Sequence, residues 1–461
     1  CIEAKDQPLG LWNYSSTTDY SHGADEDQFY KDHRTVHNSL YEFLVLNTPF
    51  QFAQFKDFQY PKNCPLFPNR QEFHQYMEKY IDHFGLRSFY RLSTYVLEVR
   101  LLKSLKQEEQ ELLKIEGVDI TKKFLVRTIK SSDLNRERIL NESCDYCFVA
   151  NGHNSVPLNC SLEGKEFFKG SIIHSHSFRR PDEEMFIGKT VAVIGTSYSG
   201  MDMMVQLLTN PELGDVKVKK LILSGDTQFV EKTTDYKKFI EEGRLSFKEG
   251  KKQRVLSNGK LEFSDGSIEE VDTIVLATGY QYTFPFFDKG GDELVKIEAE
   301  GKYFGPLFLR MFCINEPDLI FIGSNDFTLF VQVILERQCI ISRDYLEGKV
   351  KLPSKETMTE DLNKEIKESF IEKNIPLQKY WKLFPNVQDV AYLKKMAEFG
   401  NYRLNQEHID KLIPLGDLIL KHVVNGNWIQ YRNDPLLRTM YPDFEGDHSY
   451  IEENGIRTEL F

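Results

Sequence analysis

The sequence predicts an α/β fold, because one segment has the pattern of a strand, a tight turn, a helix and a second strand in succession. The first strand is Thr190–Ile194 (TVAVI), a short apolar and mostly β-branched run that suits a strand buried on both faces. Gly195 ends it, and residues 199–208 have a helical pattern. The second strand, residues 220–224, follows at the distance of a βαβ unit, and residues 273–277 (TIVLA) repeat the pattern of a buried strand.

The flanking segments add a helix and several short strands. In residues 70–84, aromatic and aliphatic side chains recur at helical spacing, which is typical of a helix packed on a core. The other expected strands are residues 95–102, 128–131 and 146–150, and a hairpin that joins residues 261–263 to 267–269. We expect the C-terminal third to be mostly helical, with a charged and solvated face at residues 356–373.

Charge and cysteine content narrow the class of protein. The 461 residues include 70 acidic and 58 basic ones, a net charge of −12, which argues against nucleic acid or an anionic membrane as a partner. Seven irregularly spaced cysteines favour a reducing compartment over a disulfide framework. Cys144 and Cys147 form a C-x-x-C pair, but they lie in a stretch with a strand pattern and no second pair follows, so we predict no metal site.

The turn after the first strand has the spacing of a dinucleotide-binding loop. Its six residues are Gly195, Thr196, Ser197, Tyr198, Ser199 and Gly200, which is G-x-G-x-x-G with serine at the middle glycine. The first glycine permits the tight turn, the last lets helix and strand pack closely, and the helix N-terminus offers free N–H groups to a pyrophosphate. The Cβ of Ser197 could crowd that phosphate, although its hydroxyl could donate to it. We predict that this loop binds a dinucleotide.

The end of the second strand usually decides between NAD and NADP. Here Ser224, with Lys232 or Lys237 nearby, would suit a 2′-phosphate, whereas Asp226 would suit a ribose hydroxyl. Ser224 is our candidate contact, and the choice of dinucleotide stays open on these residues alone.

Several motifs, in fixed order along the whole chain, resemble those of the flavin-containing monooxygenases. Residues 168–178 match F-x-G-x-x-x-H-x-x-x-[FY] directly before the glycine-rich turn. Residues 151–153 are similar to the family's N-G-H segment, and residues 276–280 (LATGY) to its A-T-G-type motif. Further matches are Glu3 with Gly10-Leu11-Trp12 (E…G-G-x-W), Asp57-Phe58 with Tyr60-Pro61, Phe67-Pro68, residues 83–86 and Leu352-Pro353-Ser354.

The resemblance implies two dinucleotide-binding, Rossmann-like domains, one inserted in the other. An FAD-binding domain would comprise residues 1–164 and 283–461, the second part with a helical extension, and an NADP-binding domain would comprise residues 165–282. The implied activity is that of a flavin-dependent monooxygenase. NADPH would reduce FAD, O2 would add to form a C4a-hydroperoxyflavin, and oxygen would pass to a small-molecule amine nitrogen or sulfur. Two alternatives stay open: a non-catalytic, truncated relative that binds nucleotide, and another two-domain flavin oxidoreductase such as an N-hydroxylating monooxygenase.

The resemblance also assigns residues by position. Asn47 is the candidate catalytic residue, because it follows an S-L-Y run at residues 39–41 and has the family's spacing to Asp57. Its amide would hydrogen-bond the flavin hydroperoxide or the nicotinamide; the alternative is a turn-forming asparagine before Thr-Pro. His174 is expected to be structural rather than a general base. The candidate cofactor contacts outside the turn are Glu3, Gly10, Leu11, Trp12, Thr278 and Gly279.

One part of the family pattern has no counterpart. Family members begin with a strand, a glycine-rich turn, a helix and a second strand that ends in an acid, and this sequence begins at what resembles the end of that second strand, Cys1-Ile2-Glu3. We therefore expect the FAD phosphate-binding unit of roughly 25–30 residues to be missing and FAD binding to be weakened. Leu9 also stands where the first glycine of G-G-x-W is expected. Without an apolar anchor we expect a soluble, cytoplasmic form, with peripheral association with the endoplasmic reticulum and a homodimer left open.

Overall fold

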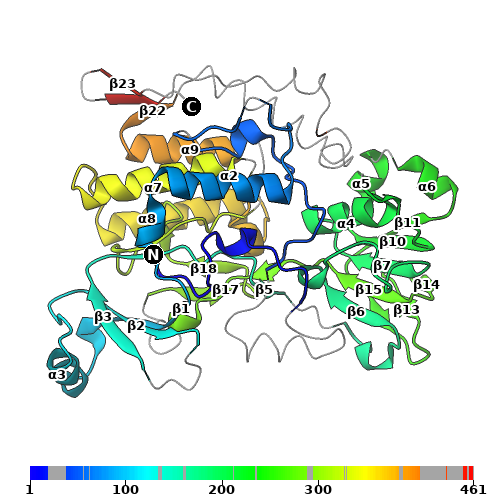
Figure 1. Ribbon diagram of the computed structural model, residues 1–461, viewed down its shortest axis with the longest axis horizontal. Coiled ribbons are helices and arrows are strands. Elements are labelled where there is room, and N and C mark those ends of the chain that lie inside the picture. The colour runs from blue at the N-terminus through cyan, green and yellow to red at the C-terminus, as the bar shows by residue number, and fades with distance from the viewer. Residues whose placement is uncertain are drawn as a thin grey trace.

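The computed structural model has two lobes, which Figure 1 shows side by side. The smaller lobe is formed by the middle of the chain (green), and the larger lobe combines the N-terminal segments (blue to cyan) with C-terminal helices (yellow to orange). The structure describes residues 1–18, 38–55, 57–61, 63–132, 138–158, 162–210, 212–233, 236–287, 294–326, 328, 330–383, 388–404, 432, 450–453 and 456–459.

The helices and strands are short, and their bounds are as follows. The helices are α2 (Arg70–His83), α3 (Gln107–Ile115), α4 (Tyr198–Leu208), α5 (Gln228–Thr233), α6 (Lys237–Glu241), α7 (Val331–Leu346), α8 (Lys355–Ile366) and α9 (Gln388–Phe399). The strands up to residue 225 are β1 (Thr94–Leu101), β2 (Phe124–Lys130), β3 (Leu140–Cys144), β4 (Cys147–Val149), β5 (Val156–Pro157), β6 (Ser171–His174), β7 (Thr190–Ile194), β8 (Thr209–Asn210), β9 (Gly214–Asp215) and β10 (Lys220–Gly225). The later strands are β11 (Leu245–Glu249), β12 (Arg254–Val255), β13 (Leu261–Glu262), β14 (Ile268–Glu269), β15 (Thr273–Leu276), β16 (Tyr280–Gln281), β17 (Lys296–Glu298), β18 (Tyr303–Gly305), β19 (Leu307–Phe308), β20 (Phe312–Cys313), β21 (Leu319–Phe321), β22 (Tyr402–Leu404), β23 (Tyr450–Glu453) and β24 (Ile456–Glu459).

A five-stranded parallel sheet, in the order β11-β10-β7-β15-β6, forms the centre of the smaller lobe. Every residue of β7 and β15 is buried, as expected for a parallel sheet that is covered on both faces. Alternate residues of a strand point to opposite faces, and β7 follows this rule. Val191 and Val193 belong to the same core as α4, whereas Ala192 and Ile194 pack with the small β12-β13-β14 sheet.

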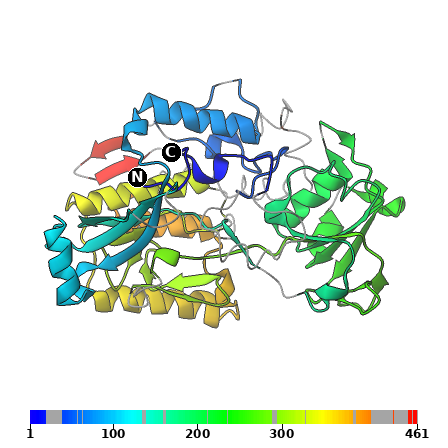
Figure 2. The same cartoon turned by 60° about the horizontal axis from the view of Figure 1, so that its bottom comes forward.

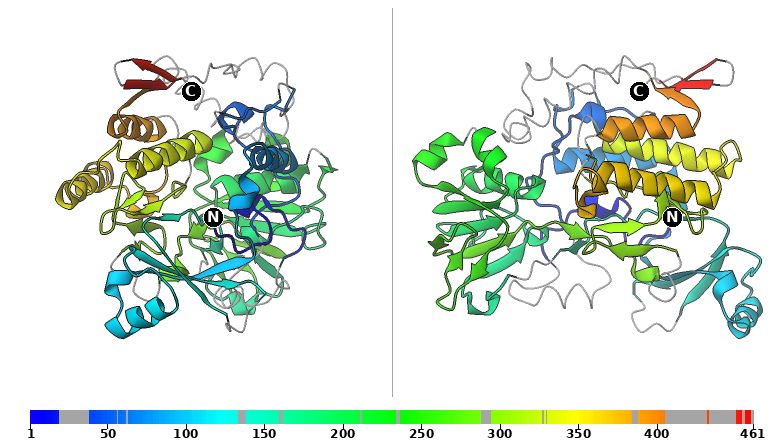
Figure 3. Two further views of the ribbon diagram at one scale, coloured as in Figure 1. Left: turned by 60° about the vertical axis from the view of Figure 1, so that its left-hand side comes forward. Right: turned by 180° about the vertical axis from the view of Figure 1, so that it is seen from behind.

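The larger lobe is a layer of helices on a mixed sheet. Figure 3 shows α7, α8 and α9, in yellow to orange, stacked in this layer. The sheet has the order β19-β20-β21-β4, and its strands β21 and β4 run parallel although they come from opposite sides of the smaller lobe in the sequence. An antiparallel sheet of β1, β2 and β3 with helix α3 projects at the far end (Figure 2, cyan).

The segment at residues 38–46 ties the two lobes together. The buried guanidinium of Arg179 donates to the backbone oxygen of Leu40 at 2.8 Å. The side chain of Gln206, on α4, donates to the backbone oxygen of Phe43 at 3.2 Å. These bonds hold the segment against the smaller lobe, just before the chain enters the larger lobe.

The predicted α/β class is confirmed, with a parallel-sheet lobe inserted in the chain and helices in the C-terminal part. One detail was wrong. Cys144 ends β3 and Cys147 begins β4, so the C-x-x-C pair spans the link between two strands rather than lying in one. The C-terminal part also contains a sheet of order β22-β24-β23, and residues 405–431 of the expected helical extension lie outside the described residues.

Two further findings concern the described residues only. Every cysteine among them is a free thiol, although Cys64 and Cys313 are buried. None of the helices in this part of the chain combines the length and the apolar character needed to cross a membrane.

Candidate cofactor-binding sites

The glycine-rich turn between β7 and α4 has the backbone geometry that its spacing predicts. Gly195 has a φ of +122°, and a Cβ there would lie 2.2 Å from the carbonyl oxygen of Ala277, just after β15. At Gly200 a Cβ would lie 1.8 Å from the carbonyl oxygen of Gly195. Both distances are far inside van der Waals contact, so glycine is required for the turn, α4 and β15 to approach this closely.

The side chains of this turn leave the start of α4 open to a ligand. Ser197 is the N-cap residue of α4, yet its side chain makes no capping hydrogen bond, and both Ser197 and Ser199 are exposed. The first N–H groups of a helix have no partner within the helix, and the positive end of its dipole lies there. Backbone N–H groups with two serine hydroxyls fit the pyrophosphate of a dinucleotide.

Thr278 and Gly279 lie beside the turn, where the chain leaves the smaller lobe. The backbone N–H of Ala277 donates to Ile194 at 2.8 Å, which joins the end of β15 to the end of β7. The hydroxyl of Thr278 donates to the backbone oxygen of Leu158 at 2.7 Å. These bonds place both residues at the crossing between the lobes, and their contact with a cofactor stays a prediction.

Ser224 is bonded to other groups of the protein inside the smaller lobe. Its hydroxyl donates to the backbone oxygen of Lys248 at 3.1 Å and accepts from the side chain of Gln253 at 2.9 Å, and the residue is fully buried. A nucleotide would have to displace one of these bonds to reach it. Lys237 is exposed on α6, and the side chain of Lys232 lies outside the described residues.

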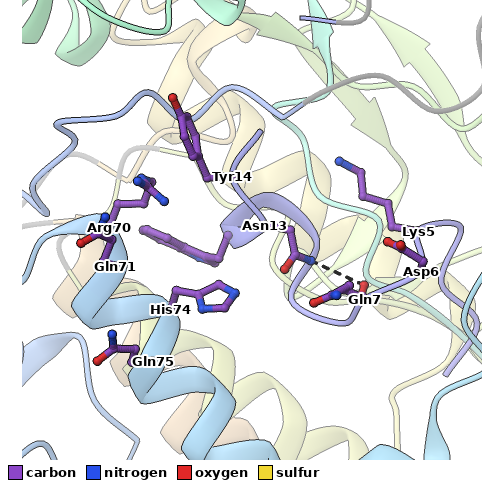
Figure 4. Close-up of a pocket in the computed structure, with 10 residues that line it drawn as sticks. Lys5, Asp6, Gln7, Asn13, Tyr14, Arg70, Gln71, His74 and Gln75 are labelled. Atoms are coloured by element: carbon purple, nitrogen blue, oxygen red, sulfur yellow. Dashed lines mark hydrogen bonds between the residues drawn. The ribbon is translucent and has the colours of Figure 1, made fainter. Parts of the chain in front are cut away.

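A polar cavity of about 560 Å³ lies in the larger lobe, between residues 5–14 and the first turns of α2 (Figure 4). Trp12 forms part of its wall and packs on Phe73 with 4.2 Å between the ring centroids. The guanidinium of Arg70 lies 3.9 Å from the ring centroid of Tyr14. The lining residues are Lys5, Asp6, Gln7, Trp12, Asn13, Tyr14, Arg70, Gln71, His74 and Gln75. An aromatic wall beside cations and amides suits a heterocycle that carries hydroxyl or phosphate groups.

The predicted FAD residues meet this cavity only in part. Trp12 lines it, and Gly10 and Leu11 form a 3₁₀ turn with Trp12. Leu9 adopts a φ of +79°, so it keeps the left-handed conformation that a glycine at this position would favour. Glu3 does not line the cavity, and its carboxylate accepts a hydrogen bond from the backbone N–H of Lys5 at 2.9 Å.

Asn47 follows the segment that ties the lobes together. It is half-buried, and its Oδ1 accepts from the hydroxyl of Thr48 at 3.4 Å. The preceding residue, Leu46, is held by a bond from its N–H to the backbone oxygen of Pro68 at 2.8 Å. Asn47 therefore lies near the junction of the lobes, and its catalytic role stays a prediction.

His174 ends β6 and is completely buried. Its Nδ1 accepts from the backbone N–H of His176 at 3.0 Å, and both imidazole rings lie near Tyr280. Burial lowers the pKa of His174 to about 3, so the ring is neutral at physiological pH. A buried, neutral imidazole agrees with the structural role expected for it.

Sequence reasoning missed a polar cluster where the two lobes meet. β4 and β21 are parallel, and residues 151–153 and 323–326 follow their carboxyl ends. There, Nε2 of His153 lies 3.9 Å from a carboxylate oxygen of Asp326. Burial raises the pKa of Tyr198, on the first turn of α4, and the carboxylates of Asp326 and Asp389, which belong to the larger lobe, raise it further. Ligands of open α/β sheets bind beyond the carboxyl ends of parallel strands, and both sheets direct those ends to this junction.

A second missed residue is Asp202, one helical turn after Tyr198. Its side chain lies in an otherwise apolar stretch of α4 and is 8% exposed. Burial raises the pKa of this carboxyl to about 8, with a smaller opposing effect from its hydrogen bond to Gln206. Asp202 is therefore mostly protonated at neutral pH. A lone acid within an apolar helix was the signal that could have identified it.

A dinucleotide turn in an inserted α/β lobe, facing a second lobe with its own polar cavity, is the architecture of a two-nucleotide oxidoreductase. The sequence profile described as flavin-binding monooxygenase-like matches residues 27–213 and 235–407, which is most of the chain. This chain belongs to the flavin-binding monooxygenase-like family, as its motifs predicted.

Individual relatives agree with this assignment. The trimethylamine monooxygenase of Methylocella silvestris is 28% identical over 367 residues, which cover 79% of this chain and 70% of the relative. The senecionine N-oxygenase of Tyria jacobaeae is 25% identical over 360 residues, which cover 77% of this chain and 68% of the relative. The fold is that of S-allyl-L-cysteine S-oxygenase from Allium sativum, with a TM-score of 0.72, 22% identity, and 95% of this chain and 91% of the other covered.

The chain is thus a flavin-dependent monooxygenase, and enzymes of this family use FAD and NADPH. The residues present fit these groups. The turn at residues 195–200 offers N–H groups and hydroxyls to a dinucleotide phosphate, and the cavity beside Trp12 and Arg70 offers an aromatic wall and a cation to part of FAD.

Proposed function

We propose that this enzyme oxygenates a soft nucleophile, an amine nitrogen or a sulfur, with NADPH as reductant and O2 as the source of oxygen. Two relatives carry names that specify trimethylamine and N-oxygenation, and a protein of the same fold is an S-oxygenase. The structural observation that carries the proposal is the junction of the lobes, toward which the carboxyl ends of both sheets point. When bound there, FAD would take up electrons from NADPH and activate O2.

The residues of this chain would bind and orient the cofactors. The first turn of α4, with the hydroxyls of Ser197 and Ser199, would hold the NADPH pyrophosphate. Trp12 and Arg70 would hold part of FAD in the cavity of Figure 4. Asn47 has a carboxamide that can both donate and accept, which suits the amide of the nicotinamide ring.

The junction would also shield the reaction from water. Tyr198 has a buried hydroxyl, and Asp202, one turn further along α4, is a protonated acid. His174 and His176 are completely buried where the lobes connect, and the low pKa of His174 keeps that ring uncharged. Buried and uncharged groups would exclude water from this region, and the oxygen chemistry that bound FAD would supply needs such shielding.

The test is a stoichiometry. The overall reaction consumes one NADPH, one proton and one O2 for each N-oxide or S-oxide, and it releases NADP⁺ and water. The protein, supplied with FAD, should oxidise NADPH faster when a tertiary amine or a thioether is added, with an equal amount of oxide formed. A matched alcohol without nitrogen or sulfur should give no product. NADPH consumption that yields only hydrogen peroxide with every amine and thioether tried would refute the proposal.

A further inference from the structure

One exposed ion pair stands at the corner of the smaller lobe where β10 and β11 end. Asp226 directly follows β10, and its carboxylate lies 2.8 Å from Nζ of Lys251, which follows β11 by two residues. Their side chains are 70% and 72% exposed, so a ligand can reach both. The loops that carry them are joined by a hydrogen bond from the N–H of Gly250 to the backbone oxygen of Gly225 at 2.9 Å.

This corner adjoins the dinucleotide turn. β10 lies next to β7, the strand that enters the turn. Gly225 has a φ of +149°, and a Cβ there would lie 3.0 Å from Cγ2 of Thr196, so the end of β10 touches the turn itself. In dinucleotide-binding folds the residue that follows the second strand contacts the adenosine ribose, where NAD and NADP differ. Asp226 occupies that position.

The neighbouring polar groups are engaged with the protein. The backbone N–H and the hydroxyl of Thr227 both donate to the carboxylate of Glu249, at 2.8 and 2.7 Å. Nζ of Lys248 lies 3.7 Å from the carboxylate of Asp265 and is mostly buried. Ser224 is buried, and its hydroxyl makes two hydrogen bonds within the protein. Asp226 and Lys251 are therefore the groups that a ribose substituent would meet. Their ion pair is weak because both side chains are exposed to solvent.

We propose that the Asp226–Lys251 ion pair sets the choice between NADPH and NADH. Lys251 would bind the 2′-phosphate of NADPH, whereas Asp226 would repel that phosphate and accept a hydrogen bond from the 2′-hydroxyl of NADH. Because the two charges act in opposite directions, the enzyme accepts both dinucleotides, with affinities within about tenfold of each other. The inference rests on the proposed function only in that a dinucleotide binds at residues 195–200.

Binding of NADP⁺ and NAD⁺ to the full chain, measured by titration calorimetry, tests this without turnover. Lys251→Ala should weaken NADP⁺ binding about tenfold and leave NAD⁺ binding within about twofold. Asp226→Asn should strengthen NADP⁺ binding about three- to tenfold and weaken NAD⁺ binding. The matched control is Lys252→Ala, the next exposed lysine of the same loop, which should change neither affinity by more than about twofold.

Salt provides a second readout, because the pair acts through exposed charge. Raising the salt from about 50 to about 300 mM should weaken NADP⁺ binding more than NAD⁺ binding in the natural sequence, and this difference should shrink in Lys251→Ala. An affinity ratio that neither Asp226→Asn nor Lys251→Ala changes would overturn the inference, as would a loss carried by Lys252→Ala instead. Those results would leave the proposed function standing, whereas failure to bind either dinucleotide would contradict both.

Discussion

The two proposed nucleotide sites of this enzyme are built in opposite ways. The turn at residues 195–200 is contiguous, and the carbonyl that excludes a side chain at Gly200 belongs to Gly195 in the same turn. The cavity of the larger lobe joins residues 5–14 to the start of α2, and Trp12 is the one lining residue that the sequence predicted as a cofactor contact. A site made by local backbone geometry is visible in the sequence, whereas a site made by packing appears only when distant segments meet.

The largest effect should come from the contiguous site. In Gly200→Ala the new Cβ would lie 1.8 Å from a carbonyl oxygen, so the turn must open. We expect NADP⁺ binding to weaken at least about hundredfold and the free energy of unfolding to fall by about 2–3 kcal/mol. Titration calorimetry and chemical denaturation measure the two quantities.

Gly348→Ala is the matched control for that variant. Gly348 has a φ of +70° with open space around the position of a Cβ, so the substitution carries only backbone strain of about 1 kcal/mol. NADP⁺ binding should stay unchanged. If Gly200→Ala behaves like Gly348→Ala, the turn is not a rigid binding site.

The helix behind the turn should show itself in the pH dependence of stability. Burial raises the pKa of Asp202 from 3.8 to about 8, so between these values the folded state holds a proton that the unfolded state has released. Stability must therefore fall as the pH rises through this window, by roughly 3–4 kcal/mol between about pH 5 and pH 8. Asp202→Asn should remove most of this slope in denaturation curves.

Asp215→Asn supplies the comparison for Asp202. Asp215 is an exposed carboxylate paired with Arg244 at 2.9 Å, and its replacement should leave the slope nearly unchanged. Equal slopes in the natural sequence and in Asp202→Asn would mean that Asp202 is already ionised in the folded protein.

The assembled site should respond to loss of its aromatic wall. Trp12→Ala removes the ring that packs on Phe73, and we expect FAD binding to weaken about tenfold while NADP⁺ binding stays the same. Trp12→Phe should restore most of the affinity, because it keeps an aromatic face. Quenching of flavin fluorescence measures it, and an equal loss of NADP⁺ affinity would show that the two sites are not separate.

The smallest effect is expected at the junction between the sites. Asn47→Ala removes one carboxamide that would orient the nicotinamide, and it should lower the yield of oxide per NADPH by about three- to fivefold. NADP⁺ binding should change by less than about twofold, since the turn at residues 195–200 is untouched. A yield equal to that of the natural sequence would reduce Asn47 to the turn-forming asparagine that its Thr-Pro neighbours also allow.

The sequence predicted elements with a local pattern well, and it missed those that depend on packing between distant segments. β7 has the bounds that its apolar run predicted, and α4 begins one residue earlier than expected. The edge strands β6 and β11 were not predicted, because partly exposed strands lack a continuous apolar run. Ser224 was chosen for its position, but the strand turns its hydroxyl inward to the backbone of Lys248. The polar cluster of His153, Tyr198 and Asp326 could not be predicted, because these residues come from three segments that only packing brings together.

Glycine spacing and buried-strand patterns encode backbone geometry directly, so the class of the protein and its glycine-rich turn could be predicted from the sequence. The tertiary structure decided which polar groups remain for ligands. It engages Ser224 in hydrogen bonds, exposes the Asp226–Lys251 pair, buries Asp202 so that its carboxyl stays protonated, and forms the cavity beside Trp12. Burial and hydrogen bonding depend on which distant segments meet, and that information is spread over the whole chain.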